Sequence, residues 1–424
     1  MFREPGQGHT VNHLREDAIE IARESISRVL PDKALGRVLS DQSFGEKIIL
    51  VAVGKAAWRM AREALEKIPS IEKGVVLTKY GHSSGPLPPL RILEAGHPVP
   101  DENSLRATRY ILQMVEDLHP SDTVLFLLSG GGSALFEKPL PGISLEEFNL
   151  VTRDLLECGA SIVEINTLRK RLSSVKGGRF AKHVSPAKIV SVILSDVLGD
   201  RIDSIASGPA SPDSTSVSDV HRILQKYHLE FSNRIMKYLQ EETPKDTFNV
   251  TTHVIGSVRI LCEAALSSAS ERGFIPEILT TSLDCEAREA GSFIASIARE
   301  KRKLKEAYDP PLALIFGGET VVRVSGRGMG GRNQELALSA AKGISGLHGV
   351  VVLSIGSDGT DGPTDAAGAL VDGETLARLE RKGMDVDAFL SDNDSYHALE
   401  MTGDLVRTGP TGTNVNDLTL LLIR

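Results

Sequence analysis

The stretch Val124-Leu125-Phe126-Leu127-Leu128-Ser129-Gly130-Gly131-Gly132-Ser133 carries the strongest fold signal in the chain. Five apolar residues that stop at a glycine run are typical of a buried parallel strand, because both faces of such a strand are covered. In open α/β sheets, ligands bind beyond the carboxyl ends of the strands. Three successive glycines lose much backbone entropy on folding, so they indicate positive φ angles or a ligand close to the backbone. Their N–H groups suit phosphate or carboxylate oxygens.

The same unit, a short apolar run followed by a helix-forming stretch, recurs along the chain. Upstream, apolar residues 48–53 stop at Gly54-Lys55, and a helix is expected over residues 56–68. Ser144 and Ser161 each precede a glutamate at capping-box spacing, which predicts two helix starts. Further strands are expected at residues 75–77, 189–194, 253–255, 278–280, 312–316 and 350–355. This alternation predicts an α/β protein with largely parallel sheets.

Length and local composition suggest two domains. The polar residues 241–246 are the best candidate for a linker. They divide the chain into residues 1–240, expected to form a Rossmann-like larger domain, and residues 241–424, a smaller α/β domain. A helix expected over residues 14–30, which ends before Pro31, is assigned to the first domain. Each part is long enough to bury its own core.

Composition excludes several classes of protein. A formal net charge of −8 argues against a nucleic-acid-binding surface. The three cysteines form no CxxC, so neither a disulfide framework nor a zinc knuckle is supported. No apolar run approaches the ~20 residues that span a bilayer, and the N-terminus lacks the apolar core of a signal peptide. A cytoplasmic protein without nucleic-acid or membrane partners is therefore expected.

Polar and basic residues follow several strands of the first half. Lys55 would add a positive charge at the start of a helix, which suits an anion. Residues 169–182 hold six basic side chains and no acid; a solvated helix face explains most of them, but Lys176 and Arg179 flank two glycines and are expected near a ligand. Asp196 follows the strand at residues 189–194, where an aspartate can hold Mg²⁺ or accept a hydroxyl proton.

The second half offers another set of loops after strands. Residues 326–331 match G-x-G-x-x-G, so a dinucleotide site must be weighed, but the acidic residue expected about 20 positions on is missing. Arg332-Asn333-Gln334 at the following helix start suits phosphates better. His82 and His97 fall in loops of the first half and could line a cleft, but a structural or surface role is favoured for each.

Taken together, these segments resemble the glycerate kinases of the second type, the family that carries a MOFRL domain. The resemblance runs from about residue 50 to the C-terminus, with the motifs in the expected order. The matching motifs are VAVGKAA at 51–57, AGHPVPD at 95–101, LSGGGS at 128–133, INT at 165–167, KGGR at 176–179, LSDVLGD at 194–200, ASGP at 206–209, GGET at 317–320, GGRNQE at 330–335, GSDGTDG at 356–362 and TGTNVND at 411–417.

The resemblance implies two α/β domains that face each other across an active-site cleft. It implies ATP and Mg²⁺ as cofactors and D-glycerate as the substrate, usually with 2-phosphoglycerate as the product. Members of this family have also been labelled hydroxypyruvate reductases, so an NAD(P)H-dependent reductase that uses the loop at 326–331 is the first alternative. The second is a non-catalytic sensor of a small acid or nucleotide. The sequence leaves the phosphorylated hydroxyl and the oligomeric state, including a homo-oligomer, open.

For such a kinase we hypothesise direct in-line transfer of the γ-phosphoryl group. Lys55 and Arg332 would neutralise charge on the phosphoryl group or the substrate carboxylate, and Asp196 would orient or deprotonate the hydroxyl. Candidate Mg²⁺ ligands are Asp196, Glu319 and Asp358. The expected substrate and nucleotide contacts are Ser129, Gly130, Gly131, Gly132, Ser133, Lys176, Arg179, Gly318, Glu319, Gly330, Gly331, Asn333 and Asp358.

Overall fold

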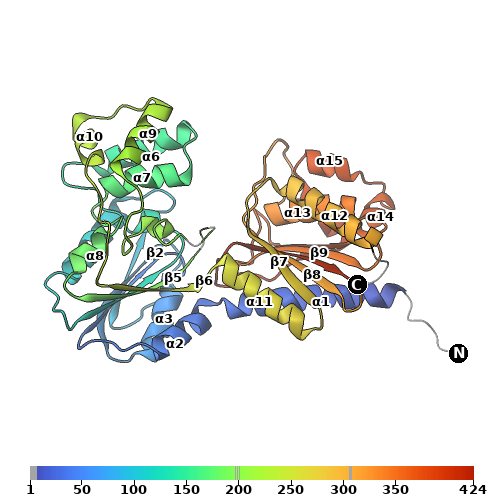
Figure 1. The fold of residues 1–424 in the computed structure, drawn as a ribbon, viewed down its shortest axis with the longest axis horizontal. Coiled ribbons are helices and arrows are strands. Elements are labelled where there is room, and N and C mark those ends of the chain that lie inside the picture. Colours follow the sequence, from blue (N-terminus) through green and yellow to red (C-terminus); the bar gives the residue numbers. More distant parts are fainter. Residues whose placement is uncertain (1–6, 196, 198, 200, 305–307) are drawn as a thin grey trace. The chain divides into compact units, whose positions relative to one another are not determined.

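The chain folds into two compact units. The computed structural model describes residues 7–195, 197, 199, 201–304 and 308–424. Contacts group Pro31–Ile255 into one unit, here called the first unit, and Met1–Leu30 with Gly256–Arg424 into another, the second unit (Figure 1). This division differs from the expected boundary at 240/241 in two ways: it falls later in the chain, and it places the N-terminal helix with the C-terminal half.

Both differences have a physical reason. The polar stretch expected to be a linker is tied into the first unit, where the Thr243 hydroxyl donates to Asp213 over 2.6 Å, and strand β6 (Val250–Gly256) completes the first sheet. Helix α1 (Gln7–Arg28) buries Leu14 and Ile21 completely. In the second unit its Arg15 pairs with Asp372 and Asp404.

The first unit is built on a sheet in the order β3-β2-β1-β4-β5-β6. Its described pairs from β3 to β5 are all parallel, as expected. The strands are β1 (Ile48–Val53), β2 (Ile71–Lys79), β3 (Leu90–Ala95), β4 (Thr123–Leu128) and β5 (Lys188–Leu194). Strands β1 and β4 are buried along their whole length, which explains their continuous apolar sequence. Around the sheet lie α2 (Pro31–Ser40), α3 (Ala57–Lys67), α4 (Glu102–Met114), α5 (Gly132–Leu135) and α8 (Arg179–Val184).

Four further helices of this unit form a cluster with a hydrophobic core of its own, at the upper left of Figure 1. They are α6 (Leu145–Glu157), α7 (Ile162–Leu172), α9 (Val217–Tyr227) and α10 (Asn233–Leu239). Both predicted capping boxes are confirmed: Ser144 and Ser161 each accept a hydrogen bond from the backbone N–H of the glutamate three residues on.

The second unit has a mixed sheet rather than a largely parallel one. Its strand order is β11-β10-β9-β12-β8-β7, and of the described pairs only β7–β8 is parallel. The C-terminal strand β12 enters between β8 and β9 and is buried throughout. The strands are β7 (Ile275–Leu283), β8 (Leu312–Gly318), β9 (Val350–Gly356), β10 (Gly368–Asp372), β11 (Leu405–Val406) and β12 (Asp417–Ile423).

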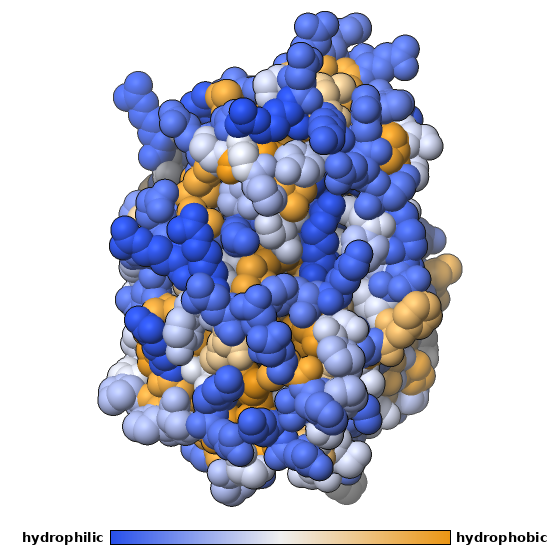
Figure 2. All heavy atoms as spheres, turned by 90° about the vertical axis from the view of Figure 1, so that its left-hand side faces the viewer, coloured by the Kyte–Doolittle hydropathy of each residue, from blue (hydrophilic) through white to orange (hydrophobic). Residues whose placement is uncertain are grey.

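Helices cover both faces of this second sheet. Helices α1 and α11 (Val258–Glu271) pack side by side on one face, and α12 (Ala287–Leu304) and α13 (Arg332–Gly343) lie on the other (Figure 1). The latter side also holds α14 (Thr375–Glu380), α15 (Val386–Ser391) and α16 (Ser395–Thr402). No helix in the described part of the chain is long and apolar enough to cross a membrane. On the face in Figure 2, hydrophobic residues are interspersed among hydrophilic ones.

Candidate active site

In the first unit, the carboxyl ends of four neighbouring strands bring the predicted loops to one edge of the sheet. Val53, at the end of β1, lies opposite Leu77 of β2 and Leu128 of β4. Because these strands are parallel, the residues that follow them share that edge. Lys55 comes just after β1, Lys79 ends β2, His97 follows β3, and the glycine loop, residues 129–133, follows β4.

The glycine loop is bonded directly to the turn that carries Lys55. The backbone N–H of Lys55 donates to the Gly130 carbonyl over 2.9 Å, and the N–H of Ala56 donates to the Ser129 hydroxyl over 3.1 Å. Gly54 has a φ of +122°, and a Cβ there would lie 2.2 Å from the Ser129 Oγ. Only glycine allows this approach, so the two loops form one surface. The structure thus brings together Lys55 and the glycine loop, as the sequence predicted.

Lys176 lies beneath this surface instead of on it, and Arg179 bonds to the end of helix α7. Lys176 is fully buried, and its ammonium donates to the Ser133 carbonyl over 2.9 Å and pairs with Glu137 over 3.3 Å. Burial lowers the pKa of Lys176 to about 8, although Glu137 opposes the shift. Arg179 donates to the carbonyls of Lys170 and Ser173. Lys176 therefore supports the backbone of the glycine loop, Arg179 supports the backbone at the end of α7, and ligand contact by either one stays a prediction.

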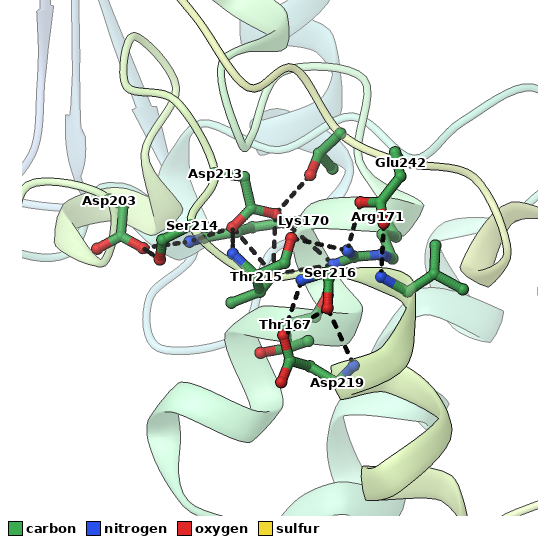
Figure 3. A network of polar contacts seen from close by, with 12 residues as sticks. Thr167, Lys170, Arg171, Asp203, Asp213, Ser214, Thr215, Ser216, Asp219 and Glu242 are labelled. Carbon is green, nitrogen blue, oxygen red and sulfur yellow. Dashed lines mark hydrogen bonds and ion pairs between the residues drawn. The ribbon is translucent and has the colours of Figure 1, made fainter.

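The expectation of a solvated basic helix face was wrong for Arg169, Lys170 and Arg171, whose side chains are all buried. Arg169 donates to the Ser133 carbonyl of the glycine loop over 2.9 Å, and Lys170 and Arg171 form the polar network of Figure 3. The Lys170 ammonium lies 3.1 Å from carboxylate oxygens of both Asp203 and Asp213. Arg171 donates to the Thr215 hydroxyl over 3.0 Å and pairs with Glu242 over 3.2 Å. These acids lie far away in the sequence, so a local count of charges could not reveal them.

A strained turn lies against the glycine loop. Ala206, Ser207 and Gly208 have φ angles of 49°, 62° and 63°, and such a conformation is unfavourable for residues other than glycine. The Ser207 hydroxyl lies 2.9 Å from the Asn166 Oδ1 and 3.2 Å from the Ser133 hydroxyl. Asn166 and Ser207 were therefore missed as neighbours of the loop, although both lie in motifs that resemble the family. Asp196, predicted just before this segment, lies outside the described residues.

In the second unit, Arg332 is the centre of a charged cluster. It opens α13 and donates two hydrogen bonds to Asp417, over 2.5 and 2.9 Å. Its third nitrogen lies 3.0 Å from a Glu319 oxygen, and the other Glu319 oxygen accepts from Asn416 over 2.9 Å. Burial opposes the charge on Arg332, but the hydrogen bonds and charge of Asp417, together with the charges of Glu319 and Asp361, outweigh burial and raise the pKa of this guanidinium. Its side chain is still 32% exposed and can face a ligand.

Four further predicted ligand contacts are in close contact with other residues of the protein. They are Gly318, Gly330, Gly331 and Asn333. Asn333 is buried, and its Oδ1 accepts from the Ser354 hydroxyl over 2.7 Å. A Cβ on Gly331 would lie 2.3 Å from the Asp361 carboxyl carbon, one on Gly330 2.2 Å from the Ser395 hydroxyl, and one on Gly318 2.1 Å from the Leu283 carbonyl. The structure therefore explains these residues without a ligand.

Asp361 caps helix α13, and the pKa of its carboxyl group is raised. Its two carboxylate oxygens accept from the backbone N–H groups of Asn333 and Gln334 over 3.1 and 2.9 Å. Burial raises the pKa of Asp361 to about 6, even though these donors lower it. An ordinary aspartate in the unfolded chain has a pKa of about 3.9. Stability from this group is therefore full below about pH 4 and is lost as the pH rises through about 6.

This shift predicts a pH-dependent difference between the wild type and Asp361→Asn, which cannot ionise. From about pH 5 to pH 7.5, the free energy of unfolding of the wild type should fall by about 1–2 kcal/mol relative to the variant. Urea titrations of both proteins at the two pH values measure it. Equal changes in the two proteins would mean that the Asp361 pKa is ordinary.

Backbone N–H groups in and beside the G-x-G-x-x-G stretch already donate to side chains of the protein and are not available to a dinucleotide. The N–H groups of Ser325 and Gly326 donate to the Asn393 side chain over 2.8 and 2.9 Å. Those of Arg327 and Met329 donate to the side chains of Asp392 and Asp394. A pyrophosphate bound in the Rossmann manner needs such donors free. The geometry therefore argues against a nicotinamide site here.

Asp358 is the described carboxylate that best fits Mg²⁺. The described residues contain no group of three or more His, Cys, Asp or Glu placed to hold a metal, but Mg²⁺ often binds one or two carboxylates plus phosphate and water. Glu319 is already engaged by Arg332 and Asn416. Asp358 is half-buried and its Oδ1 accepts from Thr360 within a turn. A Cβ on Gly356 would lie 3.3 Å from that oxygen, so the Asp358 carboxylate lies beside the end of β9.

Comparisons with known proteins cover both units. Residues 17–240 match the family model described as a domain of unknown function, DUF4147, and residues 312–417 match the MOFRL family model. The D-glycerate 2-kinase of Thermotoga maritima is 58% identical over 97% of this chain and 98% of its own length. A protein of Agrobacterium vitis named putative hydroxypyruvate reductase is 40% identical over 93% of this chain and 89% of its own.

A solved structure agrees with the fold. The crystal structure of glycerate kinase from Thermotoga maritima superimposes with a TM-score of 0.93 at 57% identity. The match covers 97% of this chain and all of the solved one. The match to this fold therefore extends over almost the whole chain.

Proposed function

The chain belongs to the family of glycerate 2-kinases with a MOFRL domain, and on this premise we propose that it transfers the γ-phosphoryl group of ATP in line to the 2-hydroxyl of D-glycerate. The proposal rests mainly on the near-complete overlap with a D-glycerate 2-kinase at 58% identity. The weaker match named as a reductase carries less weight, because the N–H donors of the G-x-G-x-x-G stretch are bonded to side chains of the protein itself.

Phosphoryl transfer requires that negative charge be neutralised and that the reacting groups be held in line. In this proposal Lys55 neutralises charge on the phosphoryl group or the glycerate carboxylate, and Arg332 does the same. Lys55 suits the role because it forms no ion pair within the described part of the chain, so its charge is available to a ligand. The N–H groups of the glycine loop bind anionic oxygens. Asp196 orients or deprotonates the hydroxyl, a role that stays a prediction.

Mg²⁺ is part of the proposal. Asp358 would hold it, and Asp196 stays a further candidate. When bound, the ion would supply positive charge to the phosphate oxygens. The cytoplasmic location and the oligomeric state stay predictions.

A ³¹P NMR spectrum of the protein with D-glycerate, ATP and Mg²⁺ tests the function. A phosphomonoester signal that grows together with ADP is expected, and its coupling to a single proton would assign the phosphate to C2. Coupling to two protons would assign it to C3 instead. Intact ATP, with consumption of NADH in the presence of hydroxypyruvate, would establish the reductase alternative. Binding of glycerate or ATP without any turnover would favour the sensor.

A further inference from the structure

The carboxyl edge of the first sheet carries a group of basic side chains that form no ion pair with the described carboxylates. Lys55, Lys79 and His97 come from the ends of three neighbouring strands and are all half-buried. None of the three forms an ion pair within the described part of the chain. His82, in the turn after β2, adds a fourth basic group and is exposed.

The acids of the same loops are engaged elsewhere. Asp101 accepts from the Tyr80 hydroxyl over 2.6 Å and from the Ser104 backbone N–H over 2.9 Å, where it caps helix α4. Glu94 accepts from the Ser83 hydroxyl over 2.7 Å. The half-buried ammonium groups of Lys55 and Lys79 lack a counter-ion among the described residues, and an anion beside them would offset this unfavourable charge. This edge therefore suits an anionic ligand.

His97 lies against the glycine loop itself. Gly131 has a φ of +88°, and a Cβ built there would lie 3.1 Å from the His97 Cδ2, 3.3 Å from its Nε2 and 3.4 Å from the Lys55 Cγ. The imidazole and the lysine stem thus both lie against the loop backbone at Gly131. A ligand oxygen held by the loop or by Lys55 would come close to the His97 Nε2.

We propose that His97 is a further substrate-binding residue, which contacts the oxyanion at this edge, either the glycerate carboxylate or a phosphoryl group, and gains a proton when that anion binds. The inference rests on the proposed function. It gives His97 a binding role, whereas the sequence alone favoured a structural or surface role for this residue. When the anion binds, the imidazole takes one proton from the buffer and becomes an imidazolium, and no other bond changes.

The direction of this coupling follows from the charges that face the ring. Burial lowers the pKa of His97, and Lys55, Lys79 and His82 lower it further. The imidazole of the free protein is therefore largely neutral near pH 7. An anion placed beside the ring favours the charged form and raises the pKa. Binding then takes up a proton, so affinity should weaken as the pH rises.

Isothermal titration calorimetry tests the coupling on the full chain. Titrations with D-glycerate and, separately, with ADP are run at about pH 7 in buffers of different ionisation enthalpy, and the slope gives the protons taken up. The His97→Gln protein should take up fewer protons than the wild type, and protons that belong to the ligand itself cancel in this comparison. His119→Gln is the matched control, because His119 is exposed, bonds to Ser121 and precedes β4 at the opposite edge of the sheet. Its uptake should equal that of the wild type.

The ligand that shows the difference identifies the oxyanion: D-glycerate for the carboxylate and ADP for a phosphate. The difference in kcat/KM between the wild type and His97→Gln should be about tenfold near pH 6, the size of one charge-assisted hydrogen bond, and smaller near pH 8.5. Equal proton uptake by both proteins with both ligands would overturn the proposal, even if the wild type phosphorylates glycerate. A wild type without any phosphorylation would instead refute the proposed function.

Discussion

Replacing Arg332 with alanine is expected to lower kcat/KM for glycerate phosphorylation by at least ~100-fold, the scale for removing one group that stabilises charge in the transition state. Arg332 is held rigidly by two bonds to Asp417 and one ion pair to Glu319. Its charge is thus already oriented before a substrate arrives, which is the condition for efficient electrostatic stabilisation. Steady-state kinetics with D-glycerate and ATP measure the effect.

The same substitution should also affect stability, and the two effects can be separated. Without Arg332, the buried Asp417 loses its partner, so the free energy of unfolding should fall by about 2 kcal/mol. The double variant Arg332→Met/Asp417→Asn removes both charges and should regain stability without regaining activity. Arg327→Ala, an exposed arginine in the neighbouring loop, is the control and should keep both. If activity returned together with stability in the double variant, Arg332 would be structural only.

The sequence predicted best what depends on neighbours in the chain. Apolar runs identified strands β1 and β4 because a strand covered on both faces needs no polar residue. The capping boxes marked two helix starts because both partners lie within one turn. The meeting of Lys55 with the glycine loop also followed, because parallel strands place their carboxyl ends at one edge.

Interactions between residues far apart in the sequence could not be predicted from local sequence patterns. Lys170 and Arg171 looked solvated because Asp203, Asp213 and Glu242 could not be placed beside them. Strand β12 lies in the middle of the second sheet although it is last in the chain, and this insertion makes the sheet mixed.

The glycines of the second unit show a different limit. Gly330 and Gly331 were expected to contact the substrate or nucleotide, and Ser395 and Asp361 lie where a Cβ of these glycines would be. A glycine indicates that another group lies close to the backbone. The sequence does not show whether that group belongs to a ligand or to another part of the protein.

Lys55→Met should match the kinetic loss of Arg332→Ala, at least ~100-fold in kcat/KM, but leave stability almost unchanged. Lys55 forms no ion pair in the described part of the chain, so no carboxylate is left without a partner when its charge is removed. Methionine keeps most of the apolar stem, which lies 3.4 Å from the Cβ position of Gly131. Thermal unfolding of the variant should therefore follow that of the wild type.

Lys47 provides the matched control, because it stands just before β1 while Lys55 stands just after it. Lys47 is exposed at the amino end of the same strand, so Lys47→Met removes an equal charge at the edge of the sheet where ligands do not bind. It should keep wild-type kcat/KM. A similar loss in both lysine variants would mean that net charge alone governs turnover. Full activity of Lys55→Met would remove Lys55 from the mechanism, and the charge of the transferring group would then have to be neutralised without it.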